Sequence, residues 1–299
     1  MAAPERTLAF IGCGNMGGAI LHGILDAAFP TDGSIPQQSR PVSNFIACTK
    51  SVPSAERLQG SLRVAHQSLV KVTSSQDVPI QLMKDADILV LGFKPFMAED
   101  VLSAQGVREA LAGKLVISLL AGQTLQNLAR IIRGDSTFGT VADPVLVKVI
   151  PNMGAQFRQS MTIIETPEAP IPQYMTEVVE WMFTQVGKIK YLPQSQMDLG
   201  SVLVGAALAA MTVPIEGILD GCVAEGLKRP DATEMVLYGL RGLSAALESG
   251  IHPAVLRESI SSPRGCTIQA LLTLERAGSR AHYADAIIDG TQHLKKANK

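Results

Sequence analysis

The stretch Thr7–Ile20 reads TLAFIGCGNMGGAI and decides how the first part of the chain folds. The apolar run Thr7–Ile11 ends directly at a glycine, which is typical of a buried strand. Residues Asn15–Ala28 then carry apolar side chains at helical spacing. The sequence therefore predicts a strand, a tight glycine turn and a helix in immediate succession.

The glycines of this turn follow the pattern G-x-G-x-x-G. In a strand–turn–helix context, the first glycine permits the turn, the second lets the backbone approach a pyrophosphate, and the third allows close packing of helix on sheet. The amino end of the helix then faces the phosphates. We expect Gly12, Gly14, Asn15, Met16 and Gly17 to contact a dinucleotide cofactor. The alternative is a glycine-rich turn without a ligand.

A second predicted strand, Phe45–Cys48, ends at Thr49, Lys50 and Ser51. Enzymes that use NAD usually place Asp or Glu here to bind the ribose 2′-hydroxyl. No acid is present, and these three side chains suit a 2′-phosphate. We therefore expect NADPH as the cofactor, with NADH possible. The alternative is that Lys50 is only solvated, because the polar loop Phe29–Asn44 leaves the strand register open.

Further apolar runs predict more strands, and helical segments lie between several of them. One helix starts at Ala55–Leu58 and another covers Leu125–Ile132. Strands that alternate with helices favour a doubly wound sheet. The additional predicted strands are Arg63–Ala65, Leu69–Val72, Asp87–Phe93, Leu115–Leu119, Val145–Ile150, Met161–Ile164 and Val186–Tyr191.

From Asp198 onward the pattern predicts helices only, at about 198–226, 231–248, 253–259, 266–277 and 281–296. The expected fold is an α/β Rossmann-like N-terminal domain, residues 1–193, followed by an all-α C-terminal domain, residues 194–299. Leu199–Ile215 carries no charge. We interpret it as a helix buried on all sides rather than a membrane span. So much apolar surface also predicts a dimer or a multiple of dimers.

The composition limits the classes of binding partner that we expect. The net charge is −1 with acids and bases well mixed, and only one Trp and four Tyr are present. We therefore expect neither nucleic acid nor a membrane as a partner. The four cysteines form no CxxC pair, and the five histidines form no HxxxH pair, so no metal site is expected. The start MAAPERTLAF does not look like a signal peptide, and we expect reduced thiols in a cytoplasmic protein.

Five motifs occur together and in order: GCGNMGGAI, ADILVLGFKPFMAEDVL, VISLLAGQTLQNL, KVIPNMGA and SSPRGCTIQALLTLERAG. In this the chain resembles pyrroline-5-carboxylate reductases, and most closely the fungal type. The resemblance covers nearly the whole chain. It implies a Rossmann domain, a helical domain that dimerises by interleaving helices, and hydride transfer from NAD(P)H to a cyclic imine, as in the last step of proline synthesis.

The resemblance also assigns residues beside the nicotinamide ribose. The "KP" of the family corresponds to Lys94 and Pro95, and its "PN" loop corresponds to Pro151 and Asn152. The alternative interpretation, without the resemblance, is a Lys-Pro turn and an Asn turn with no contact to the cofactor.

The segment SSPRGC then acquires a role. Ser262 followed by Pro263 predicts a helix N-cap and first turn, with amides free to bind a carboxylate. In the family, the matching segment holds the carboxylate and the ring nitrogen of the substrate. By position, Ser262 and Gly265 face the carboxylate. The resemblance likewise places the hydroxyl of Thr267 near the imine nitrogen, so Thr267 is expected to be the catalytic residue.

Two departures from the family pattern affect the substrate pocket. Arg264 replaces a glycine, and Cys266 replaces an alanine or threonine; both belong to the expected substrate site. Arg264 has three open interpretations: it binds a carboxylate, it blocks the pocket, or it faces solvent. In the second departure, Gly205–Ala210 lacks the family's serine and proline.

The expected reaction is the reduction of 1-pyrroline-5-carboxylate to proline. Two alternatives remain: a related imine reductase acting on another cyclic imine, and a dinucleotide-binding homologue without reductase activity. Between Asp198 and Leu227 the chain has no Lys, Arg or His. A β-hydroxyacid dehydrogenase of similar architecture would need a lysine there.

Overall fold

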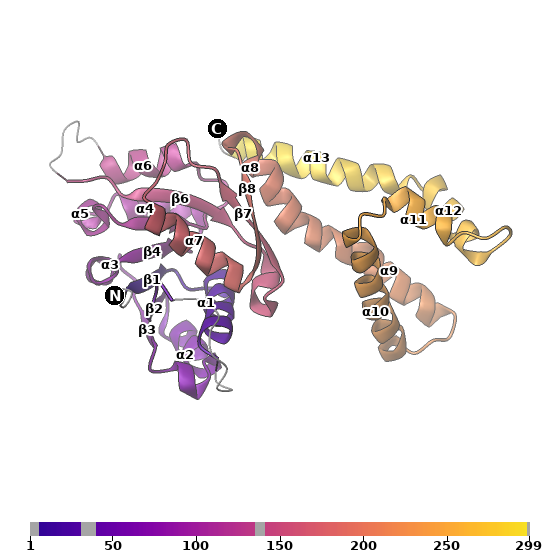
Figure 1. Ribbon diagram of the computed structural model, residues 1–299, viewed down its shortest axis with the longest axis horizontal. Helices are drawn as coiled ribbons and strands as arrows, with labels where there is room; N and C mark the ends of the chain where they lie inside the picture. The colour runs from indigo at the N-terminus through magenta and orange to yellow at the C-terminus, as the bar shows by residue number, and fades with distance from the viewer. Residues whose placement is uncertain (1–5, 31–39, 135–140, 298–299) are drawn as a thin grey trace. The chain divides into compact units, whose positions relative to one another are not determined.

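The computed structural model describes residues 6–30, 40–134 and 141–297 (Figure 1). Contacts divide the chain into two compact units. Unit 1 comprises Met1–Gly205 together with His293–Lys299, and unit 2 comprises Ala206–Gln292. A domain boundary between residues 193 and 194 stays a prediction, and part of the predicted polar loop, residues 31–39, lies outside the described residues.

Unit 1 is built on an eight-stranded sheet in the order β3-β2-β1-β4-β5-β6-β7-β8. Strand β1 pairs in parallel with β2 on one side and with β4 on the other. The strand order therefore reverses at β1, where doubly wound sheets bind their ligands. The strands are β1 (Thr7–Ile11), β2 (Asn44–Thr49), β3 (Val70–Ser74), β4 (Ile88–Leu91), β5 (Leu115–Ser118), β6 (Val145–Ile150), β7 (Ser160–Glu165) and β8 (Gly187–Leu192).

The last part of the sheet departs from a fully parallel arrangement. Strands β1 to β6 pair in parallel, whereas β7 runs antiparallel to β6 and β8 is parallel to β7. Parallel neighbours need a crossover of about a dozen residues or more. Only residues 151–159 separate β6 from β7, so the chain reverses there instead.

Helices cover both faces of the sheet (Figure 1). Helices α1, α2 and α7 pack on one face, and α3 to α6 pack on the other. The helices are α1 (Asn15–Ala28), α2 (Val52–Ser61), α3 (Ile80–Asp85), α4 (Ala98–Leu102), α5 (Val107–Leu111), α6 (Leu125–Arg133), α7 (Gln173–Gln185) and α8 (Gln194–Ser201). Short helical turns are η1 (Val64–His66), η2 (Pro95–Met97) and η3 (Met153–Phe157).

The strand predicted at Arg63–Ala65 is wrong, because η1 occupies this position. The His66 amide donates to the Arg63 carbonyl over 2.8 Å, which closes a turn. The buried His66 ring also bonds the Phe29 carbonyl at 2.8 Å. Val64 is 84% exposed. Because the Val64 side chain stays in water, no burial of apolar surface favours an extended strand at this position.

One face of the sheet buries two opposite charges. Lys148 on β6 is 3% exposed and Glu165 on β7 is 4% exposed. The antiparallel register pairs Val149 with Ile164, so Lys148 and Glu165 lie opposite one another. Burial lowers the pKa of Lys148, while Glu165 and Asp198 of α8 act to raise it. Burial likewise raises the pKa of Glu165, and Lys148 opposes that shift. Each charge therefore depends on the other for compensation.

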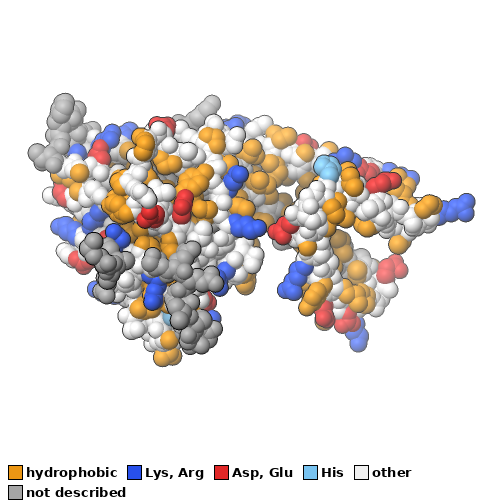
Figure 2. Space-filling view, in the orientation of Figure 1, with side chains coloured by type: hydrophobic (Ala, Val, Ile, Leu, Met, Phe, Trp, Pro, Cys, Tyr) orange, Lys and Arg blue, Asp and Glu red, His pale blue; other side chains and the backbone are white. Residues whose placement is uncertain are grey.

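Unit 2 is helical and leaves apolar side chains in the open. No residue of α9 (Ala207–Ala224) is buried, and Ala232 is the only buried residue of α10 (Arg229–Glu248). Figure 2 shows hydrophobic side chains over the surface of these helices. In the single chain, the prediction of a helix buried on all sides is wrong. The remaining helices are α11 (Pro253–Ser259), α12 (Cys266–Arg276) and α13 (Ser279–Ala297).

The apolar helix runs without a break from Gln194 to Ala224 and is long and apolar enough to cross a membrane. Length and composition alone do not separate a membrane helix from one that a second chain covers. Within this run, Val202–Ala206 form a π-helix. It coincides with the junction of the two units.

We predict that Lys148→Met lowers the free energy of unfolding by about 3–5 kcal/mol, because Glu165 is left buried without its partner. Urea unfolding measures it. The variant should regain stability as the pH falls, since an acid with a raised folded-state pKa gains stability on protonation. The double variant Lys148→Met/Glu165→Leu should lose less free energy of unfolding than the sum of the losses in the two single variants. Strictly additive losses would contradict the pairing. Arg130→Met, in the exposed Arg130–Glu99 pair, is the control, with a change of about 1 kcal/mol or less.

Candidate functional site

The first glycine of the turn is required by its surroundings. Gly12 has φ +87°, in the left-handed region that favours glycine. A Cβ at this position would lie 2.6 Å from the backbone nitrogen of Phe93. The amides of Gly12 and Cys13 both donate to the Cys48 carbonyl, over 3.0 and 2.7 Å. The turn is thus fixed between the ends of β2 and β4.

The second glycine faces open space. Gly14 is the N-cap of α1, and a Cβ built on it meets nothing within 4 Å. The next amides, of Asn15, Met16 and Gly17, lack partners within the helix because they belong to its first turn. That turn carries no acid. Free amides beside an open glycine fit the pyrophosphate of a dinucleotide.

The third glycine is less constrained than the pattern predicts. A Cβ on Gly17 would meet the Cys13 sulfur at 3.4 Å and a Phe10 ring carbon at 3.5 Å. These are ordinary van der Waals distances. Packing alone therefore leaves room for a small side chain at this position.

The end of β2 carries the residues predicted to meet a 2′-phosphate. Thr49 is buried, and its hydroxyl donates to the Ser51 carbonyl at 3.0 Å. It holds the turn, and its burial does not favour a contact with a phosphate. Lys50 is exposed, and Ser51 is the N-cap of α2. The structure therefore leaves Lys50 and Ser51 as the candidates for direct contact.

Two more predicted residues share the carboxyl edge of the sheet with the glycine turn. Lys94 follows β4 and is exposed, and Asn152 follows β6 and is 7% exposed. The side-chain oxygen of Asn152 accepts from the Gly154 amide at 2.9 Å, and the backbone amide of Asn152 donates to the Ser160 hydroxyl at 3.1 Å. Asn152 thus caps η3 and is held rigidly in place.

Sequence reasoning missed a polar link behind the Lys-Pro turn. The side-chain amide of Gln123 points to the Pro95 carbonyl at 3.4 Å, and Asn127 of α6 donates to Gln123 at 2.8 Å. Gln123 follows the carboxyl end of β5, and that position is the signal that identifies it. The link connects α6 to the loop that carries Lys94.

In unit 2, the segment SSPRGC forms a turn rather than a helix cap. The Gly265 amide donates to the Ser262 carbonyl over 3.0 Å, with Pro263 and Arg264 at the two central positions. Gly265, not Ser262, is the N-cap of α12, so the predicted cap is wrong. The physical reason is that Pro at the second turn position favours a closed β-turn. A Cβ on Gly265 would lie 2.4 Å from the Ser262 hydroxyl.

The last predicted residues begin α12. Cys266 is its first residue and is exposed, and Thr267 follows and is half-buried. The turn and the amino end of α12 therefore bring Ser262, Gly265, Cys266 and Thr267 together. This arrangement offers hydroxyls and helix amides to an anion.

Comparisons with known proteins cover nearly the whole chain. Residues 194–297 match the family model for pyrroline-5-carboxylate reductase dimerisation, and residues 7–122 match a model described as NADP oxidoreductase, coenzyme F420-dependent. The pyrroline-5-carboxylate reductase of Neurospora crassa is 36% identical over 97% of this chain and 94% of its own. The chain belongs to the pyrroline-5-carboxylate reductase family.

Other members give the same result. The pyrroline-5-carboxylate reductase of Schizosaccharomyces pombe is 31% identical over 94% of this chain and 95% of its own. The crystal structure of the Streptococcus pyogenes enzyme superposes with a TM-score of 0.75 at 27% identity, covering 98% of both chains. A Plasmodium falciparum pyrroline carboxylate reductase with NADP bound has a TM-score of 0.77 at 22% identity over 98% of both chains, and shares the fold.

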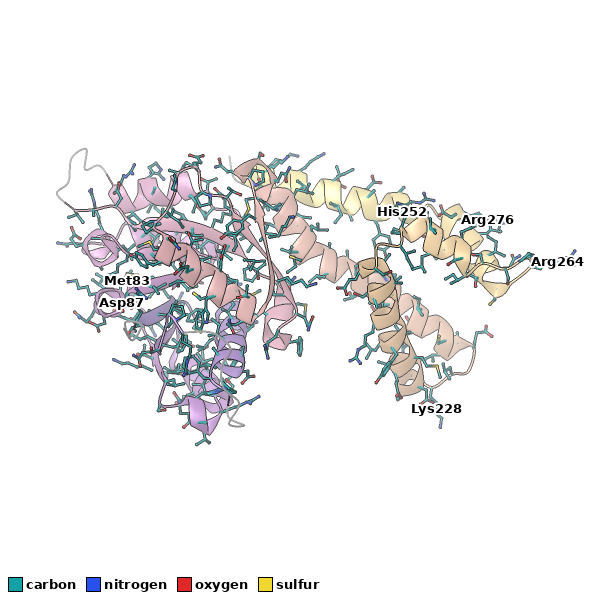
Figure 3. The ribbon with its side chains drawn as sticks, in the orientation of Figure 1. Met83, Asp87, Lys228, His252, Arg264 and Arg276 are labelled. Atoms are coloured by element: carbon teal, nitrogen blue, oxygen red, sulfur yellow. The ribbon has the colours of Figure 1, made fainter. Side chains whose placement is uncertain are left out.

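Arg264 is one of two places where this pyrroline-5-carboxylate reductase departs from the family pattern. Its φ is +61°, in the left-handed region that a glycine adopts without strain. Arg264 is exposed, and Figure 3 shows its side chain pointing away from the neighbouring helices of its unit. For a residue with a Cβ, this conformation costs about 1–2 kcal/mol. Such strain is often kept where it serves a site.

We predict that Arg264→Gly raises the free energy of unfolding by about 1 kcal/mol, because glycine relieves the left-handed strain. Urea unfolding at one fixed protein concentration measures it. Arg276→Gly is the matched control. Arg276 lies in the last turn of α12, so that change should destabilise the protein. A loss of stability on Arg264→Gly would mean that the arginine makes a stabilising contact.

Proposed function

We propose that this chain reduces 1-pyrroline-5-carboxylate to proline, with NADPH as the hydride donor. The observation that carries the proposal is the pairing of Gly12 and Gly14: one has no room for a side chain, and the other opens onto space that a pyrophosphate fits. The reductases that share the chain's length and family support the substrate.

The residues of unit 1 hold the cofactor. The glycine turn and the first amides of α1 bind the pyrophosphate, and Lys50 and Ser51 contact the 2′-phosphate. Thr49 keeps their turn closed through its hydrogen bond to Ser51. Lys94, Pro95 and Asn152 lie at the nicotinamide ribose. NADPH supplies the hydride, and the chain supplies its orientation.

The residues before and within α12 hold the imine. Ser262 and the amide of Gly265 bind the substrate carboxylate, and Arg264 adds a charge-assisted bond. Thr267 orients the ring nitrogen, with Cys266 beside it. The imine arrives protonated, so the hydride adds to the carbon of the C=N bond and the electron pair moves to nitrogen. The product is the secondary amine, and no strong side-chain acid is required.

A second candidate substrate is a different, less polar cyclic imine. It is favoured by Gly205–Ala210, which has no polar side chain where the family pattern has a serine. A third possibility is a homologue that binds the dinucleotide without reducing an imine. Turnover measurements separate all three.

The partner that fits unit 2 is a second copy of the chain. The match to the dimerisation model spans the same helices that expose apolar side chains. Covering this surface needs an apolar partner, and a homodimer supplies one. The free thiols of Cys13, Cys48, Cys222 and Cys266 support a reducing compartment, and a cytoplasmic location stays a prediction.

We predict that the purified protein oxidises NADPH with 1-pyrroline-5-carboxylate and forms proline. Thr267→Ala should lower kcat/KM by about tenfold or more, equivalent to 1–3 kcal/mol, through the loss of one positioned hydrogen bond. NADPH binding should stay unchanged. Thr273→Ala is the control, because Thr273 is exposed on the same helix and bonds the Gln269 carbonyl. Turnover with other cyclic imines alone would favour the second candidate, and no turnover with any imine would overturn the reductase proposal.

A further inference from the structure

Beyond Lys50 and Ser51, α2 carries a line of polar side chains that leads from its amino end. Ser51, Ser54 and Arg57 follow one another at a spacing of three residues, which places them along one face of a helix. The Ser51 hydroxyl donates to the Ser54 hydroxyl over 3.0 Å. The Arg57 guanidinium donates to the same oxygen over 2.9 Å.

These bonds leave donors free. The Ser54 oxygen accepts from both neighbours, so its own proton is available to another acceptor. A guanidinium has five N–H donors, and one of those of Arg57 is used by Ser54. Among the described residues, no carboxylate forms a salt bridge with Arg57, whereas Arg63 is paired with Asp26 at 3.2 Å.

The position of α2 brings these donors toward the cofactor. Its N-cap, Ser51, follows the end of β2, and the Cys48 carbonyl accepts the amides of Gly12 and Cys13. Leu58 on α2 lies 3.8 Å from where a Cβ of Gly18 in α1 would be. The helix therefore lies against α1 beside the glycine turn. The first turn of α2 carries no acid that would repel an anion.

We propose that Arg57, held by Ser54, is a direct contact of the 2′-phosphate and a determinant of the preference for NADPH over NADH. The inference rests on the proposed function and adds residues that the pattern at the end of β2 does not contain. Lys50 supplies a mobile point charge, whereas Arg57 supplies a planar fork that matches phosphate oxygens. The Ser54 contact holds that fork before the cofactor arrives, which reduces the entropy lost on binding.

Calorimetric titration with two probes tests the assignment without turnover. The probes are 2′-phospho-ADP-ribose and ADP-ribose, which share the pyrophosphate and differ only in the 2′-phosphate. The wild-type protein should bind the phosphorylated probe more tightly. Arg57→Gln should lower the affinity for the phosphorylated probe by about tenfold or more, the effect of losing a charge-assisted bond. Its affinity for ADP-ribose should be unchanged.

Two further variants sharpen the result. Arg63→Gln removes the same charge from a residue paired with Asp26 and should keep the wild-type preference. Ser54→Ala should lower the affinity for the phosphorylated probe less than Arg57→Gln does, since the guanidinium remains. Thermal melts establish that each variant is folded.

The outcomes separate the two proposals. One outcome is that the ratio of the affinities for the two probes keeps its wild-type value in Arg57→Gln, either because neither affinity changes or because both fall equally. Either result overturns the role of Arg57, while NADPH-dependent reduction stands. If the wild-type protein binds both probes equally, the preference for NADPH fails, and the role of Arg57 fails with it.

Discussion

The nucleotide end of this fold depends on the close approach between two backbone segments at Gly12 and Gly92. A Cβ on Gly92 would lie 2.8 Å from the Gly12 carbonyl oxygen, and a Cβ on Gly12 would collide with the backbone of Phe93. The chain leaving β1 and the chain leaving β4 therefore pass with no side chain between them. This contact places the amino end of α1 over the edge of the sheet where Lys94 and Asn152 also lie. The site is a consequence of that approach.

The helical unit obeys a different constraint. Its helices bury almost none of their apolar side chains within the single chain. Monomeric proteins rarely leave such large apolar surfaces open to water. A second copy of the chain is the covering that the dimerisation model indicates. The turn from Ser262 to Gly265 precedes α12 in this unit, so its function rests on helices that a partner stabilises.

The sequence predicts an element correctly where a single hydrophobic period, of strand or helix, dominates the segment. Strand β1 and helix α1 have the predicted bounds, because an apolar run, a glycine turn and a helical repeat follow each other without ambiguity. Helices α3, α4 and α5 are not predicted from the sequence, because five or six residues are too few to show a period. The 13-residue helix α7 is not predicted either. The direction of β7 depends on the length of its connection rather than on its own residues.

The site shows the same division. The sequence alone identifies three features of the site: the glycine positions, the missing acid after β2 and the segment before α12. The wrong N-cap at Ser262 arose because Ser-Pro serves both helix starts and β-turns, and only the Gly265–Ser262 hydrogen bond distinguishes them. Arg57 was missed because its relevance depends on where its guanidinium is held, by a hydroxyl three residues earlier. Side-chain hydrogen bonds of this kind leave no periodic signal.

We propose that Gly12 serves the fold and that Gly14 serves the cofactor. Replacing each by alanine, and measuring both the free energy of unfolding and NADPH affinity, tests it most directly. Gly14→Ala should keep its stability to within about 1 kcal/mol, since its Cβ meets nothing. It should nevertheless weaken NADPH binding by about tenfold or more, because the pyrophosphate needs that space. Gly12→Ala should destabilise the protein itself. A Gly14→Ala protein that binds NADPH as tightly as the wild type would contradict the role of Gly14 at the pyrophosphate.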